Sequence, residues 1–130
     1  MFSKTWTLMT ILFLITPAGA MAGAPAARLT DSGQPAFHAG SAIVGGSANV
    51  LINGLPASRI GDPTSCPQIC STPLLIPHSA GSITTGSTTV LINGIPAARL
   101  GDVIVEPATP STCQASHSIT TGSTSVLIGP

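Results

Sequence analysis

The sequence is short of charged and aromatic residues, and both shortages exclude classes of function. Only 6% of the 130 residues are charged and the net charge is zero, so four basic residues cannot build the positive surface that nucleic-acid binding requires. Aromatic residues make up 3% of the chain, and beyond residue 20 only Phe37 remains. A chain with so little bulky core material needs a metal, a partner or an interlocked fold for stability.

Motifs of the common enzyme classes are also missing. The sequence contains no GxSxG elbow, no HExxH, no phosphate-binding loop and no paired-carboxylate site. Glu106 is the only glutamate and has no evident partner in the sequence. We therefore expect no enzymatic activity and no small-molecule substrate.

What the chain does contain favours short strands and many turns. Its 14 glycines and 12 prolines disfavour long helices. The apolar residues are mostly Val, Ile, Leu and Ala, and the branched residues among them favour strands. The expected fold class is all-β.

Residues 1–22 form a segment separate from the expected fold. After Lys4, the apolar run Trp6–Ile15 spans about ten residues and leads into small residues, which is the layout of a secretory signal peptide and short for a membrane span. The alternative is that translation starts at Met21 and the preceding sequence is not part of the protein. In either case the domain is expected to span residues 23–130.

Two phrases recur three times each along that domain. The first, I-x-x-G-S-x-x-V-L-I, occupies Ile43–Ile52, Ile83–Ile92 and Ile119–Ile128. The second, P-A-x-R-[LI]-x-D, occupies Pro25–Asp31, Pro56–Asp62 and Pro96–Asp102. Two copies of the first phrase are followed directly by Asn-Gly. This dipeptide is a strong hairpin turn signal because both residues accept a positive φ. Each unit is therefore predicted to be a short hairpin, and three copies suffice for a repeat architecture.

The third unit is split between the two ends of the chain. Its first phrase ends at Ile128 and its second phrase opens at Pro25. The halves balance only if the ends meet, so we predict a closed pseudo-threefold arrangement in which the N-terminal arm pairs beside the C-terminal strand. Closure would also protect exposed strand edges.

Each arginine is followed three residues later by an aspartate. The pairs, with the proline that opens each phrase, are Pro25, Arg28 and Asp31; Pro56, Arg59 and Asp62; and Pro96, Arg99 and Asp102. We interpret them as ion pairs that fix turn geometry, with the aspartate accepting backbone N–H groups and the arginine fork. The alternative is a ring of arginines used for binding or catalysis.

Histidines and cysteines gather in the segments that lead into the repeat strands. His38 and His78 each lie five residues before the first isoleucine of their unit. If the fold is threefold, these segments converge at one end of the axis, where four ligands would suit tetrahedral zinc. The candidate ligands are His38, Cys66, His78 and Cys113, with His117 able to replace one of the cysteines. The alternatives are solvent-exposed histidines and a Cys66–Cys70 disulfide in an exported chain.

The phrases P-A-A-R-L-T-D, P-A-S-R-I-G-D and P-A-A-R-L-G-D, with G-S-x-x-V-L-I-N-G between them, resemble those of PAAR-repeat proteins. The resemblance covers residues 23–130. It implies a small conical β fold with structural zinc near its apex, held by three histidines and one cysteine in the typical member. The longer Cys66–Pro77 linker of this chain departs from that pattern.

The resemblance also implies a function. Such a protein sits on the trimeric VgrG-type spike of a type VI secretion system, sharpens it, and can carry separate effector or adaptor proteins. Its contact with the target cell envelope would be transient, and it would stay cytoplasmic until the apparatus secretes it. The hydrophobic leader suggests an alternative, an exported envelope-associated zinc-binding structural module.

Overall fold

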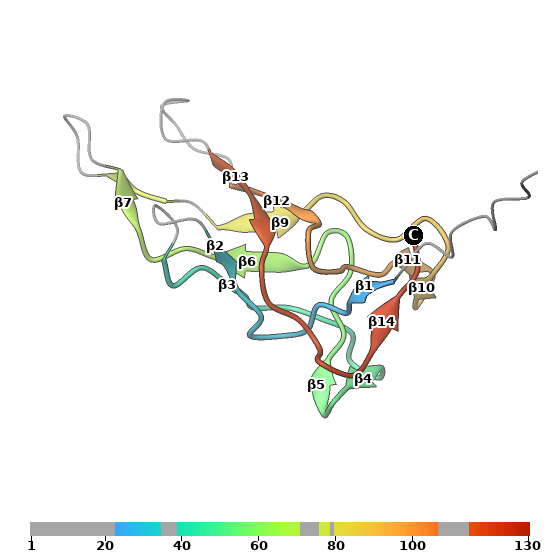
Figure 1. Cartoon of the computed structure of the whole chain (residues 1–130). Coiled ribbons are helices and arrows are strands. Elements are labelled where there is room, and N and C mark those ends of the chain that lie inside the picture. Colours follow the sequence, from blue (N-terminus) through green and yellow to red (C-terminus); the bar gives the residue numbers. More distant parts are fainter. Residues whose placement is uncertain (1–22, 35–38, 71–75, 79, 107–114) are drawn as a thin grey trace, which may run out of the picture.

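The computed structural model describes residues 23–34, 39–70, 76–78, 80–106 and 115–130 (Figure 1). The described part is all-β, with short strands joined by turns and no helix. The strands are β1 (Ala24–Pro25), β2 (Gly33–Gln34), β3 (Ala42–Ile43), β4 (Leu51–Ile52), β5 (Leu55–Pro56), β6 (Pro63–Ser65), β7 (Ile69–Cys70), β8 (Ile76–Pro77), β9 (Gly81–Ile83), β10 (Leu91–Ile92), β11 (Ile95–Pro96), β12 (Val103–Glu106), β13 (Ala115–Ile119) and β14 (Leu127–Ile128).

Two of the predicted hairpins form at the Asn-Gly turns. Strands β4 and β5 pair antiparallel around Asn53-Gly54, and β10 and β11 pair in the same register around Asn93-Gly94. Asn53 has a φ of 52° and Gly54 a φ of 79°. These positive values define the two-residue turn that suits the twist of a hairpin.

The third pair joins the two ends of the domain and confirms the predicted closure. Strand β1 pairs antiparallel with β14, with Ala24 opposite Ile128 and Pro25 opposite Leu127. The register matches the other two pairs, because in each of them a leucine lies opposite a proline. The β1–β14 pair therefore takes the place of the third hairpin.

Backbone contacts between the units form a closed ring. The N–H of Ser58 donates to the carbonyl of Ala27, that of Ala98 donates to Ser58, and that of Ala27 donates to Ala98, with N···O distances of 3.0, 2.9 and 3.0 Å. Each unit thus donates to one neighbour and accepts from the other. This cyclic pattern is what a pseudo-threefold axis requires.

Beyond the hairpins, six strands form one antiparallel sheet in the order β2-β13-β12-β9-β6-β3. A single bridge between Ser32 and Ala42 links the segments of the two edge strands. The sheet therefore curls around the same axis, and each unit contributes two of its strands (Figure 1).

The core consists of two apolar clusters built from repeat-related residues. The cluster between the hairpins contains Ala26, Ala57, Ala97, Ile52, Ile92 and Ile128, with Val50, Val90 and Val126 packed against it. The second apolar cluster contains Ala27, Ala98, Ile43, Ile83, Ile104 and Ile119. Small alanines permit the close approach of backbones that the ring requires, and isoleucines fill the remaining volume.

The structure contains the predicted Arg–Asp ion pair in all three units. In the first unit, Asp31 Oδ2 accepts the backbone N–H of Arg28 at 2.7 Å and the Nε–H of its guanidinium at 3.0 Å. The equivalent bonds join Arg59 to Asp62 and Arg99 to Asp102. The hydrogen bonds that the Arg28 guanidinium donates to Asp31 raise the pKa of Arg28 despite the opposing effect of burial. Arg28 therefore stays charged, and the ion pair holds the turn closed.

Residues 1–22 lie outside the described residues, so the predictions made for the leader remain predictions. Across the part of the chain that the structure describes, no helix has the length and apolarity needed to cross a membrane.

Candidate metal centre

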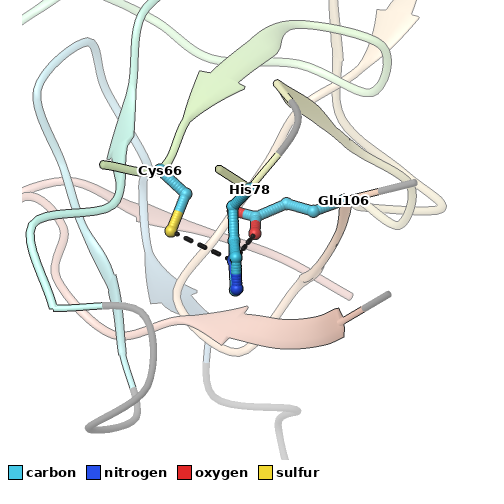
Figure 2. Close-up of side chains that lie close together, drawn as sticks. All are labelled: Cys66, His78 and Glu106. Carbon is cyan, nitrogen blue, oxygen red and sulfur yellow. Dashed lines mark hydrogen bonds and ion pairs between the residues drawn. The ribbon is translucent and has the colours of Figure 1, made fainter. Parts of the chain in front are cut away.

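Three side chains that could hold a metal ion gather at the end of the molecule opposite the hairpins, two at the ends of strands of the six-stranded sheet and one at the end of β8. Cys66 follows the end of β6, His78 follows the end of β8, and Glu106 is the last residue of β12. Figure 2 shows these three side chains pointing toward one another. One donor atom from each lies within 4.8 Å of the others, a spacing from which a single metal ion can be reached.

The histidine of this group contacts both other side chains. His78 Nδ1 lies 3.5 Å from Cys66 Sγ and 3.1 Å from Glu106 Oε2. All three side chains are shielded from solvent: Glu106 is fully buried, and Cys66 and the side chain of His78 are about nine-tenths buried. A buried carboxylate beside an imidazole is a costly arrangement unless charge is compensated.

A second histidine lies on the other side of the same carboxylate. His117 on β13 is buried, and its Nε2 lies 3.9 Å from Glu106 Oε1 and 3.3 Å from Ser41 Oγ. Glu106 therefore lies between two imidazoles, one directly after β8 and one on β13.

Two glycines make room for the larger polar side chains. A Cβ at Gly81 would lie 2.7 Å from Glu106 Cγ, and a Cβ at Gly33 would lie 2.3 Å from His117 Cδ2. Gly81 occupies the place, two residues before the repeat isoleucine, that His117 occupies in the third unit. The three units therefore differ in sequence at this end. A glycine in one unit leaves space that a large polar side chain from another unit fills.

The structure brings together two of the four predicted zinc ligands. Cys66 and His78 lie side by side, whereas His38 and Cys113 lie outside the described residues, so those two stay predictions. The structure adds Glu106, which our reading of the sequence left without a partner. A signal was available, because Glu106 follows Asp102 at the same four-residue distance by which Cys66 follows Asp62.

The geometry does not fit a cysteine nucleophile. A catalytic histidine uses one ring nitrogen toward the nucleophile and the other toward the carboxylate, but here Cys66 and Glu106 approach the same nitrogen of His78. Burial raises the pKa of the Cys66 thiol, an effect that the negative charge of Glu106 strengthens and a backbone hydrogen bond from Gln68 opposes. Such a thiol is a weak nucleophile.

The same donors do fit a metal ion. Thiolate, imidazole and carboxylate are the ligands that zinc accepts, and a divalent cation would replace the thiol proton and offset the carboxylate charge. The buried, closely spaced group is therefore suited to a structural metal.

Comparison with known families bears on this assignment. The family model described as the PAAR motif matches residues 14–70 and 76–130. The chain belongs to the PAAR-motif family. Members of the family are structural, generally metal-binding proteins related to the spike tip of type VI secretion systems. No curated protein gave a significant match.

Proposed function

We propose that this PAAR-motif protein caps and sharpens the trimeric VgrG-type spike of a type VI secretion system, without enzymatic activity. The observation that carries the proposal is the set of three exposed leucines on the three strand pairs. Leu51, Leu91 and Leu127 are about 60% exposed each and occupy equivalent places on β4, β10 and β14, because each lies opposite a proline of its partner strand. We call them the leucine set.

The leucine set suits a partner with threefold symmetry. In each strand pair the leucine alternates with a buried isoleucine, so its outward orientation follows from the period of two along a strand. Large exposed apolar side chains that recur by symmetry favour an interface over chance exposure. A homotrimer offers three identical contact surfaces around one axis, which one pseudo-threefold chain can occupy together.

The opposite end would form the tip. Cys66, His78 and Glu106 belong to neither apolar cluster of the core, and a zinc ion bound there would stiffen this end in place of apolar packing. The set predicted from the sequence is His38, Cys66, His78 and Cys113. In this role the protein stays in the cytoplasm until firing, carries separate effector or adaptor proteins, and meets the target envelope only transiently.

The second candidate is an exported, envelope-associated zinc-binding structural module. The feature that favours it is the signal-like apolar run within residues 1–20. Intact mass of the natively expressed protein separates the two: cleavage near Ala20 together with a periplasmic location supports export, and a chain that starts at Met21 in the cytoplasm supports the spike role.

The experiment that tests the proposed function is co-purification with a trimeric VgrG-type spike protein from the same source. The unmodified chain should bind, and Leu91→Asp should weaken binding by about tenfold or more, because burying one leucine contributes about 1.5–3 kcal/mol. Ile69→Asp is the matched control, since Ile69 is similarly exposed on β7 at the other end. Failure of the unmodified chain to bind, or equal weakening by both substitutions, would contradict the proposal.

A further inference from the structure

Glu106 is the feature of the metal centre that the predicted ligand set does not use. Its carboxylate is fully buried and lies 3.1 Å from His78 Nδ1. Burying an ionised carboxylate costs several kcal/mol unless a positive group compensates it. The question is therefore which positive charge the carboxylate meets.

The arginines are already engaged elsewhere. Each arginine binds the aspartate three residues further along the chain, and Lys4, the remaining basic residue, lies in the leader. Among the described residues, the imidazoles of His78 and His117 lie 3.1 and 3.9 Å from the Glu106 carboxylate, and a metal ion held by Cys66, His78 and Glu106 would also meet its charge.

Charge balance and coordination number then distinguish between two ligand sets. A divalent cation bound by one thiolate, one carboxylate and two neutral imidazoles gives a neutral buried site. The same cation bound by two thiolates and two imidazoles has no place left for a carboxylate in a four-coordinate site, yet a Glu106 oxygen lies within 4.8 Å of the donor atoms of Cys66 and His78.

We propose that Glu106 is a metal ligand and takes the place assigned from the sequence to Cys113, so that Cys66 supplies the only sulfur. The inference rests on the metal centre of the proposed function. His78 is the third donor of this group.

Position in the repeat agrees with this assignment. Cys66 and Glu106 both lie four residues after the aspartate of their motif. Cys66 directly follows β6 and Glu106 ends β12, and these two strands flank β9 in the sheet. Equivalent positions in two units thus provide a thiol and a carboxyl group to the same candidate metal centre. Gly81 on the intervening strand leaves the space into which the Glu106 side chain extends.

X-ray absorption at the zinc edge of the purified full chain tests the proposal directly. One sulfur and three nitrogen or oxygen neighbours are expected. Two sulfur neighbours would overturn the role of Glu106 while leaving the metal centre intact. A chain that binds no metal would overturn the centre itself, so the two failures are distinguishable.

A pair of substitutions gives a second readout through zinc affinity, measured by competition with a chromophoric chelator. Glu106→Gln keeps the size of the side chain and removes its charge, and should weaken zinc binding by more than about 100-fold, beyond what loss of an outer hydrogen-bond partner causes. Cys113→Ser should leave the affinity within about twofold, because a residue that is not a ligand contributes little to binding. A larger loss of zinc affinity for Cys113→Ser than for Glu106→Gln would overturn the proposal. Circular dichroism of each variant separates loss of a ligand from loss of folding.

Discussion

At the scale of single residues, one position of the repeat shows a local conflict between sequence and backbone. The sixth residue of the second phrase is Gly61 or Gly101 in two units and Thr30 in the first. All three have a positive φ, with values of 85°, 92° and 73°. Glycine adopts this conformation freely, whereas a β-branched residue is strained in it.

We therefore expect Thr30→Gly to stabilise the protein by about 1 kcal/mol. Relief of strain of about 1–2 kcal/mol outweighs the added flexibility that glycine gives to the unfolded chain, about 0.5–1 kcal/mol. Denaturant unfolding measures the difference. Gly101→Thr is the reciprocal variant and should destabilise, and a stabilised Gly101→Thr would contradict this account.

Residue identities also limited how much of the metal centre could be predicted. Cys66 and His78 were found because thiol and imidazole are unusual in this sequence and recur near the repeat strands. Glu106 was missed because a lone glutamate in a strand resembles a solvated surface residue. The register of β12, which turns Ile104 and Glu106 to the same buried face, shows that it points inward, and its place in the repeat, equivalent to that of Cys66, was the signal in the sequence.

At the scale of elements, each strand pair is held by a buried serine from the repeat. Ser47, Ser87 and Ser123 each accept the backbone N–H of the residue three positions on, at 3.0, 2.9 and 2.9 Å. Ser123 and Ser47 also donate to the side chains of Asn53 and Asn93 in the turns of other units. The hydroxyl of Ser47 or Ser123 therefore accepts a hydrogen bond within its own loop and donates one to the turn of another unit.

Ser123→Ala should consequently destabilise the protein by about 1–3 kcal/mol. The substitution removes the acceptor of the partly buried Val126 N–H and leaves the Asn53 side-chain oxygen with the Arg28 guanidinium as its remaining donor among the described residues. Thermal unfolding measures the loss. Thr124→Ala, at the adjacent exposed position, is the control and should change stability by less than about 0.5 kcal/mol. Equal effects of the two substitutions would show that the serine does not fasten the turns.

Strands of the repeat were predictable, and strands outside it were not. The Asn-Gly turns and the V-L-I segments predicted β4–β5 and β10–β11 because turn chemistry fixes their register. The hairpin β7–β8 lies in the elongated linker, where no copy exists for comparison. The order of the six-stranded sheet depends on contacts between distant segments, which local periodicity does not encode.

At the scale of the whole molecule, three near-copies close around an axis because the two ends of the domain complete each other's strand pair. The split of the third unit predicted this closure, and the pairing of β1 with β14 confirms it. Symmetry is kept at the hairpin end, where the leucine set lies, and broken at the other, where Cys66, His78 and Glu106 meet. One end is thus suited to a threefold partner, and the other to a single metal ion.

Stoichiometry of the complex tests this account most directly. Native mass spectrometry of the chain co-expressed with a trimeric VgrG-type spike protein should give one chain bound to three spike subunits, because a single pseudo-threefold chain occupies all three equivalent surfaces. Three chains bound to one trimer, or no complex at all, would contradict it.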